Sequence, residues 1–567
     1  MFVGCGGDSK KSETASDSAS EGIFSTAAVN YAADGEAVYA IVRPDNGTQT
    51  EIDMALLLFK QYRDAHAVKA KNTSDILDGV DNYEILIGNT NRPETAQAKE
   101  WLCTNINKRT DNYIICTIGK KIVIYGNSDD ALNNAVDYFV KNYLSAPQSK
   151  GIKYTYAVEG NFTELAINGV SVSEFSIIRP RYNSSYLTYA EVEKMVDKIY
   201  KSTGYKLRIN DDTVTDEAKY EIIIGNCARP NVTQYEVRDE YYVKISGDKI
   251  YINGGSHQAT TIAVSELIKK LDGKTALTDA DSFDGSYQLT VANYDTKTYY
   301  TPKFYDDFDS ISGDNVNANG LDTNKWKLTT ESSTGKNGYK ATRSTDPSRV
   351  FVADGLFQIH PYFDYDTNTY YGGFLRSQNQ MDFTYGYIEY SARIPDGPGF
   401  WTALWLRCSD HSGSSRPEID IAESFGNSKT FAFNLHTWPG NEAEQFGVTH
   451  TSLDGGKYPD KKKICPDGKK FNDDFHTYGM LWTPEVAWAT CDGVPYFKYT
   501  MGDKDTDSWC FGKLMNICIS MAVGFESCEG DPLTASPEVW ENNAVYLVDW
   551  VYVYQLDDNI QKMVFYK

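Results

Sequence analysis

The first half of this 567-residue chain repeats itself. The segment YEILIGNTNRP at 83–93 is echoed by YEIIIGNCARP at 220–230, and YIICTIGKKIVIYG at 113–126 is echoed by YYVKISGDKIYINGG at 241–255. In both copies one amphipathic helical pattern precedes the first block and another follows the second. Each copy therefore predicts a small β-α-β-β-β-α domain in which helices pack on a sheet.

The repeats carry no recognisable catalytic group. Gly88 and Gly225 lie in glycine-containing turns, but no Walker lysine and no GxGxxG pattern accompanies them, so we interpret them as turn glycines. A strand, "IGN", "RP", a hairpin and a helix resemble the accessory α/β domain that precedes the catalytic barrel in some hexosaminidases and glucuronidases. We expect a spacer or docking module here.

Near residue 296 the pattern changes to short alternating strands separated by Gly, Asp, Asn and Ser. Segments such as YGYIEYSARI, FAFNLHTW and VYLVDWVYVYQ are typical of an all-β sandwich. The expected organisation is a flexible tether at 1–22, α/β copies at 23–158 and 159–295, and a β-sandwich at 296–567.

Charge and apolar runs exclude several classes of partner. The chain has 55 Lys and Arg against 78 Asp and Glu, a net charge of -23, which disfavours nucleic acid and anionic membranes. No stretch of about 18 apolar residues occurs, so we expect no transmembrane helix. The 41 Tyr, 25 Phe and 10 Trp suit a sugar-binding cleft, although Tyr-rich sheets would give the same count. The ten Cys show no zinc-like spacing, and we expect mostly free thiols.

The N-terminus resembles the end of a bacterial lipoprotein signal. Phe2-Val3-Gly4-Cys5 has the form in which the cysteine becomes lipidated, and a Ser-, Lys- and Asp-rich tether follows. The alternative is an ordinary disordered terminus with a chance cysteine. We expect an extracellular or bacterial cell-surface protein with a lipid anchor at Cys5.

Three carboxylates in RPEIDIAESFG at 416–426 form the strongest candidate site. On a regular strand Glu418 and Asp420 share a face and Glu423 points away. A β-bulge between Asp420 and Glu423 would restore the phase and place all three on one side. The decoy TEIDMALL at 50–57 has no third acid and lies in a helical pattern.

The same spacing predicts a mechanism. With the bulge, Glu418 and Glu423 lie about 13 Å apart at Cα, at roughly 3.3 Å per residue. Inward-leaning side chains can narrow the carboxyl gap to roughly 5–5.5 Å, the value for a retaining glycosidase. Charges this close cannot all ionise, so Asp420 would hold a shared proton. The alternative is a solvated acidic strand face.

Residues from about 300 to 556 resemble glycoside hydrolase family 16, the laminarinase, lichenase, agarase and carrageenase group. The matching motifs, in order, are FYDDFDS, LDTNKW, YGYIEYSARIPDGPGFWTALWL, EIDIAE, FHTYGMLWT and VDWVYVYQ. The resemblance implies a β-jelly roll with a concave cleft. It also implies Glu418 as nucleophile, Glu423 as general acid/base and Asp420 as auxiliary acid.

The resemblance further implies substrate-binding and metal residues. The sugar subsites would be lined by Trp401, Trp405, His436, Trp438 and Arg376. A structural calcium would take ligands from Asp307 and Asp549, and catalysis would need no cofactor. Thr402 stands where the family often has Pro, and FESCEGDP replaces the usual GG-x-W-P-G, so these subsites depart from the family pattern.

We therefore expect a monomeric, retaining endo-glycosidase that acts on a β-linked polysaccharide. The first candidate substrate is 1,3-β-glucan or 1,3-1,4-β-glucan. The alternatives are a β-galactanase of the agarase or carrageenase type on the same fold, and a catalytically silent glycan-binding protein.

Overall fold

The computed structural model describes residues 21–77, 82–156, 162–213, 217–233, 240–286, 302–309, 315–409, 415–439, 451–452, 462–465, 468–500, 511–554 and 562–565. The expected anchor at Cys5 lies outside these residues. The chain divides into two compact units. The first unit holds Met1–Phe175, Val196–Leu207 and Lys274–Ala276, and the second holds Ser176–Met195, Arg208–Gly273 and Leu277–Lys567.

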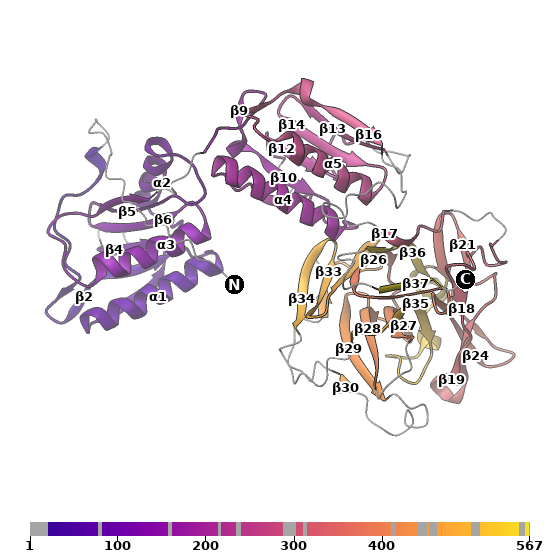
Figure 1. Ribbon diagram of the computed structural model, residues 1–567. Coiled ribbons are helices and arrows are strands. Elements are labelled where there is room, and N and C mark those ends of the chain that lie inside the picture. The colour runs from indigo at the N-terminus through magenta and orange to yellow at the C-terminus, as the bar shows by residue number, and fades with distance from the viewer. Residues whose placement is uncertain are drawn as a thin grey trace. The chain divides into compact units, whose positions relative to one another are not determined.

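The first unit contains an α/β sheet covered by helices on both faces (Figure 1). Its strand order is β1 (Ala32–Ala33), β2 (Glu36–Arg43), β4 (Glu84–Ile87), β6 (Lys121–Gly126), β5 (Tyr113–Ile118) and β7 (Lys153–Tyr156), with β3 (Lys69–Ser74) paired to β2. Strands β2, β3, β4 and β6 are parallel, and β5 returns antiparallel to β6. Helices α1 (Gln49–His66) and α3 (Asp129–Phe139) pack on one face and α2 (Pro93–Asn105) on the other.

Helix α2 and strand β3 were not predicted from the sequence. The buried residues of α2 are Thr95, Ala98, Trp101 and Leu102, and two of these four are not large apolar side chains. Strand β3 reads KAKNTS and has no apolar alternation. Both elements form because they pair with or pack on a sheet that is already apolar, so tertiary context outweighs their weak local signal.

A capping box begins helix α1. The Thr48 side chain accepts from the Glu51 backbone N–H, and Glu51 Oε2 accepts from the Thr48 N–H at 2.9 Å. Such a box satisfies two backbone donors that a helix start leaves open. The other oxygen of the same carboxylate, Oε1, accepts from the backbone N–H of Asn89 at 2.7 Å, in the turn after β4. Glu51 thus joins the helix start to the end of a neighbouring strand.

The second unit contains another α/β sheet. Its strand order is β11 (Ile209–Asp211), β10 (Ser176–Arg179), β12 (Glu221–Ile224), β14 (Lys249–Gly254), β13 (Glu240–Ser246) and β16 (Phe283–Ser286). Strands β11, β10, β12 and β14 are parallel and β13 is antiparallel to β14. Helices α4 (Tyr186–Thr203) and α5 (His257–Lys270) follow β10 and β14.

The start of helix α4 meets a carboxylate from far along the chain. Glu389 accepts a hydrogen bond from Ser185 Oγ at 2.7 Å and from the backbone N–H of Tyr186 at 2.9 Å, across 203 residues of sequence for the second bond. Glu389 belongs to β26 of the β-sandwich and is completely buried. A carboxylate at a helix N-terminus is favoured by the partial positive charge of that end.

The rest of the second unit is the predicted all-β sandwich. One sheet, the β36 sheet, runs β21 (Val350–Ala353), β22 (Leu356–Ile359), β36 (Tyr546–Tyr554), β26 (Gly386–Arg393), β32 (His476–Trp482), β33 (Val486–Cys491) and β34 (Val494–Thr500), with β17 (Pro302–Asp306) paired to β36. The other, the β28 sheet, runs β19 (Ser332–Thr334), β20 (Lys340–Ser344), β24 (Thr369–Arg376), β35 (Met515–Val523), β27 (Phe400–Cys408), β28 (Ser415–Ser424), β29 (Thr430–Pro439) and β30 (Thr451–Ser452). Short strands complete its edges: β18 (Lys327–Leu328), β23 (Tyr362–Asp364), β25 (Met381–Thr384), β31 (Lys462–Ile464) and β37 (Lys562–Phe565).

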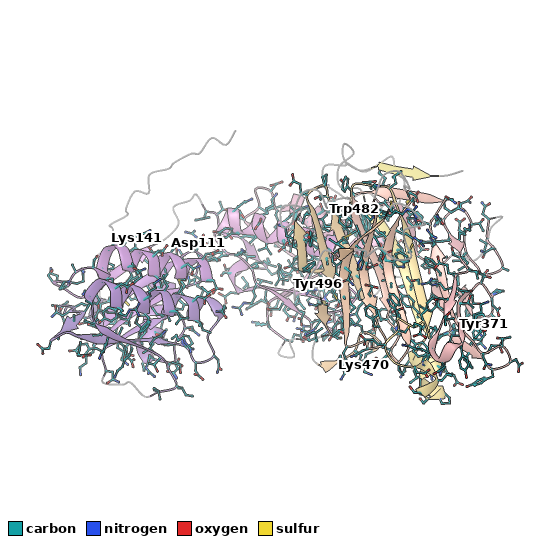
Figure 2. All side chains as sticks on the ribbon, turned by 90° about the horizontal axis from the view of Figure 1, so that it is seen from below. Asp111, Lys141, Tyr371, Lys470, Trp482 and Tyr496 are labelled. Carbon is teal, nitrogen blue, oxygen red and sulfur yellow. The ribbon has the colours of Figure 1, made fainter. Side chains whose placement is uncertain are left out.

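One hydrophobic core fills the space between these sheets. Figure 2 shows side chains projecting from the closely spaced strands of this half. Trp482 of the β36 sheet is fully buried and meets Phe383 of the β28 sheet edge to face, at 5.7 Å between ring centroids. The sandwich thereby leaves the second face of the β28 sheet available for a site.

Two further expectations concern transmembrane helices and free thiols. Within the described residues, no helix is both long and apolar enough to cross a membrane. Cys116, Cys227, Cys491, Cys518 and Cys528 are buried and form no disulfide.

Candidate active site

Strand β28 contains the predicted bulge. Against β29, Asp420 pairs with Asn434 and Glu423 pairs with Ala432, so two residues of β28 oppose the single Phe433. The register with β27 shifts at the same place. This is the arrangement of a β-bulge, which returns a strand to its original phase after one extra residue. Glu418, Asp420 and Glu423 therefore point to the same side of the sheet, as expected.

The face that they share is polar, and the opposite face is core. Directly paired residues of neighbouring strands lie on the same face. On β27 the partners of the three acids are Arg407, Trp405 and Ala403; on β29 they are His436, Asn434 and Ala432. Ile419 and Ile421, between the acids, are buried in the hydrophobic core on the other side. The acidic strand face is thus part of a built site, and Asp420 and Glu423 are only 3% and 6% exposed.

Two donors hold Glu423. Trp401 Nε1 donates to Glu423 Oε1 at 3.1 Å, and Asn434 Nδ2 donates to Glu423 Oε2. Trp401 is itself stacked on Phe425, with ring centroids 5.2 Å apart. These contacts fix the direction of the carboxyl group before any substrate binds.

His436 lies close to both Glu418 and Asp420. Its Nε2 lies 3.0 Å from Asp420 Oδ2. A carboxylate oxygen of Glu418, a carboxylate oxygen of Asp420 and a ring nitrogen of His436 all lie within 4.8 Å of one another. Three such atoms at this spacing could hold a metal ion. That catalysis needs no cofactor therefore stays a prediction.

Burial changes the protonation of all three acids. It raises the pKa of Glu418 to about 8, helped by the negative charge of Asp420 and opposed by His436 and Arg407. Burial and the charge of Glu423 raise the pKa of Asp420 well above its usual range. Burial also raises the pKa of Glu423, while the hydrogen bond from Asn434 opposes the rise. The cluster thus retains protons at a pH where isolated carboxyls have lost them.

The other expected sugar contacts have different surroundings. Trp405 lies on the site face, where its Nε1 donates to Ser520 Oγ at 3.0 Å and its ring stacks on Phe374. Arg376 is 6% exposed, and its Nε donates to Asn516 Oδ1 at 3.2 Å. Trp438 pairs with Arg416 in the ladder, but its side chain lies outside the described part of the structure.

Sequence reasoning did not name Asn434 or Arg407 for the site. Both follow from the ladder, because Asn434 stands opposite Asp420 and Arg407 opposite Glu418. The signal was present in FAFNLHTW, where Asn434 precedes His436 by two residues and so shares its face.

The expected calcium ligands lie in the second unit. Asp549 stands where the register between β26 and β36 shifts, and its Oδ2 accepts from Ser391 Oγ at 3.4 Å. Asp307 Oδ1 accepts from the Asp309 N–H at 3.3 Å. Among the described residues neither belongs to a group of three acidic, histidine or cysteine side chains within metal-binding distance. Calcium is coordinated by about six to eight oxygens, so backbone or water oxygens would have to supply most of these ligands.

A β-sandwich with several carboxyls on one sheet face fits a glycoside hydrolase, because these enzymes place a pair of carboxyl groups on either side of the bond they cleave. Residues 302–556 match the profile of the family described as "Beta-porphyranase A-D, GH16 domain". Residues 302–556 thus form a glycoside hydrolase family 16 domain within this chain.

Two curated relatives illustrate the similarity. Glucan endo-1,3-beta-glucosidase A1 of Niallia circulans is 25% identical over 273 residues, 43% of this chain and 37% of the relative. Beta-glucanase of Rhodothermus marinus is 28% identical over 201 residues, 34% of this chain and 64% of the relative. The chain therefore spans less than two thirds of the length of these relatives. A solved laminarinase from Rhodothermus marinus aligns with 45% of this chain and 98% of its own, at 24% identity and a TM-score of 0.36.

Proposed function

We propose that this protein is a retaining endo-glycosidase that cleaves a β-linked polysaccharide, with 1,3-β-glucan as the first candidate substrate. The bulge in β28 supports this proposal, because it aligns Glu418, Asp420 and Glu423 on one face. A simple acidic surface would need neither the bulge nor the near-complete burial of Asp420.

The three acids divide the reaction between them. Glu418 as carboxylate attacks the anomeric carbon, while Glu423 gives its proton to the leaving oxygen, and a glycosyl ester forms as the glycosidic bond breaks. Water then attacks the ester, Glu423 takes the proton of the water, and Glu418 leaves as carboxylate. Asp420 shares a proton with Glu423: its strongly raised pKa lets it take up that proton when Glu423 is ionised, and it carries a negative charge when Glu423 is protonated. Trp401 and Asn434 orient Glu423 through both of its oxygens.

The relatives support glucan as substrate. Of the two curated relatives described above, one is named a glucan endo-1,3-beta-glucosidase and the other a beta-glucanase. A third, from Rhizobium meliloti, is named an endo-1,3-1,4-beta-glycanase and is 30% identical. A β-galactan is the second candidate substrate. The matching family profile is named after porphyranases. A keratan-sulfate endo-1,4-beta-galactosidase of Sphingobacterium multivorum is also 23% identical over 224 residues.

A purified-protein screen on laminarin, mixed-linkage glucan, agarose, porphyran and carrageenan, with product sizing, tests the proposal. We expect reducing ends and short oligosaccharides from laminarin, and none from the Glu418→Ala variant. Asp53→Ala is the matched control, because Asp53 lies in the decoy Glu51-Ile52-Asp53 and is hydrogen-bonded only within helix α1, to Gln49. Cleavage of porphyran alone would move the assignment to galactan. Cleavage of none, or full activity in Glu418→Ala, would favour a glycan-binding protein.

The remaining expectations are part of the same proposal. The two α/β sheets share strand order and buried ion pairs, which supports two copies of one accessory domain. Polymer-degrading activity fits an extracellular or cell-surface location with a lipid anchor at Cys5. Removing residues 1–295 and comparing activity on soluble and insoluble glycan tests whether these domains assist the enzyme. A monomer is expected in size-exclusion chromatography, and an effect of chelator on the melting temperature would indicate the calcium.

A further inference from the structure

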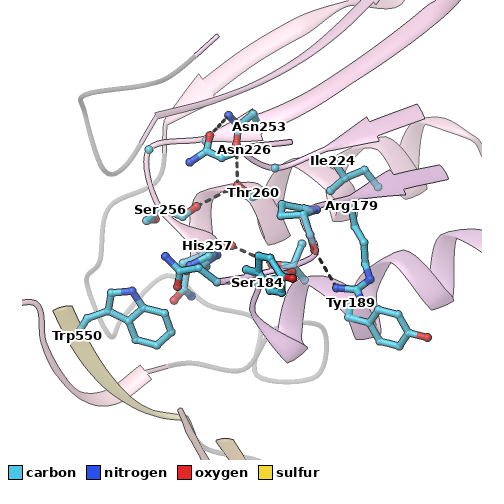
Figure 3. Close-up of a pocket in the computed structure, with 18 of the residues that line it drawn as sticks. Arg179, Ser184, Tyr189, Ile224, Asn226, Asn253, Ser256, His257, Thr260 and Trp550 are labelled. Atoms are coloured by element: carbon cyan, nitrogen blue, oxygen red, sulfur yellow. Dashed lines mark hydrogen bonds between the residues drawn. The ribbon is translucent and has the colours of Figure 1, made fainter. Parts of the chain in front are cut away.

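A cavity of 540 Å³ lies in the second unit, and its lining includes none of the three acids. Figure 3 shows many of the residues that line it. The cavity opens where the parallel strands β10, β12 and β14 end and helices α4 and α5 begin. In open α/β sheets, ligands bind in the crevice at the carboxyl ends of the strands. The volume is within the range of small-molecule sites. Within the α/β sheet, Arg179, Thr188, Asn226, Asn253, Ser256 and His257 contribute to its lining.

The corresponding crevice in the first unit is filled by one side chain. There Glu51, three residues after the helix cap Thr48, reaches over Gly88 at the end of β4. A Cβ on Gly88 would lie 2.3 Å from Glu51 Oε1, so the carboxylate sits directly against the turn. It accepts from the backbone N–H groups of Thr48 and Asn89 and is 8% exposed.

The second α/β sheet repeats the surroundings of this crevice. In the first sheet, buried Glu84 pairs with Arg92 and Lys121; in the second, buried Glu221 pairs with Arg229 and Lys249. Asp75 in the first sheet accepts backbone N–H groups from two loops, and Asp212 in the second does the same. The two crevices can therefore be compared residue by residue.

The second crevice has no carboxylate in the position that Glu51 occupies in the first. Thr188 stands three residues after Ser185, as Glu51 stands after Thr48, and its Oγ1 is hydrogen-bonded to Thr261 Oγ1 at 2.8 Å. Above Gly225, the nearest atom to an added Cβ is Pro180 Cγ at 3.2 Å, and no acid is close. The space that a carboxylate fills in one copy is a cavity in the other.

We propose that this cavity binds a sugar that carries a carboxylate, such as a uronic acid. The carboxylate of the ligand takes the place of Glu51 over the turn after β12, whereas the Tyr186 N–H at the start of α4 is already bonded to Glu389. The rest of the cavity suits a sugar ring, because Trp550 lines it, packed edge to face on His257 at 5.3 Å, together with amide and hydroxyl side chains. Asp309, Asp474 and Asp549 also line the cavity from the β-sandwich and can accept hydrogen bonds from sugar hydroxyls. This site goes beyond the proposed hydrolase activity and does not depend on it.

Calorimetric titration of the full chain with three probes tests the proposal. The probes are glucuronate, the neutral methyl β-glucoside and acetate. We expect glucuronate to bind and both other probes to bind at least tenfold more weakly. Thr188→Glu, which restores the plug, should weaken glucuronate binding at least tenfold, and Thr188→Val, which adds no volume, should retain it.

Circular dichroism and the urea midpoint verify that each variant is folded. If Thr188→Glu does not fold, Thr188→Gln fills the same space without the charge and should also weaken binding. Absence of glucuronate binding would overturn the proposal, and so would unchanged binding in a folded plugged variant. If the glucoside bound as tightly as glucuronate, the site would not require a carboxylate. If acetate bound as tightly, the site would not require a sugar ring.

Discussion

Replacing Glu418 by Gln should stabilise the catalytic domain at pH 8 and leave its stability nearly unchanged at pH 4. Burial and the charge of Asp420 raise the pKa of Glu418 from 4.5 to about 8. A carboxyl whose pKa is raised by folding binds protons more tightly in the folded state. The free energy of unfolding therefore falls as the pH rises from about 4.5 to about 8. Each pH unit in that window is worth roughly 1.4 kcal/mol, so the gain in the variant approaches about 5 kcal/mol.

Urea unfolding at pH 4, 6 and 8 measures this gain. Trp101 is the single tryptophan ahead of residue 302 in the sequence, so intrinsic tryptophan fluorescence follows the C-terminal domain. Glu485→Gln is the matched control, because Glu485 is exposed in the turn between β32 and β33. Equal stabilisation at all three pH values, or a loss of stability at pH 8, would refute the reasoning from burial.

Four further substitutions have defined outcomes. Asp420→Asn removes a charge that raises the pKa of Glu418, so the acid limb of kcat/KM on laminarin should move to lower pH; an unmoved limb would argue against charge coupling. Asn434→Ala removes a donor that lowers the pKa of Glu423, so the alkaline limb should move to higher pH, and a downward move would contradict the hydrogen bond's role. Gly88→Ala should lower the free energy of unfolding by about 2 kcal/mol or more and Gly225→Ala by about 1 kcal/mol, measured in urea. Both glycines have positive φ, but only a Cβ at position 88 would collide with a buried carboxylate, and equal losses would refute that distinction.

The three acids and their bulge could be predicted because a strand has a strict period of two. An acid one residue out of phase either points into the core or requires a bulge, and burying Glu423 among Ile419 and Ile421 would be costly. The partners on the next strand could not be predicted in the same way. Asn434 faces Asp420 only because of the register between β28 and β29, which spacing within one strand does not reveal.

The α/β half shows the same limit. The repeat predicted strands β2, β4, β5 and β6 with their counterparts β10, β12, β13 and β14, and the helices α1, α3, α4 and α5, because their apolar patterns recur in both copies. It did not predict that Glu51, part of a motif dismissed as a decoy, fills a crevice in the first copy. That role depends on the turn after β4, 38 residues away in sequence, whose N–H the carboxylate accepts.

The start of helix α4 has a consequence for the order in which this chain folds during synthesis. Helix α1 carries its own capping box, Thr48 and Glu51, in its first turn, so this helix start is complete soon after it leaves the ribosome. Helix α4 receives a carboxylate from Glu389, which is translated 203 residues after Tyr186. At roughly 5–20 residues per second, that interval is on the order of ten to forty seconds. During that time the nascent second sheet has an incomplete helix start, and its folding becomes complete only together with the β-sandwich.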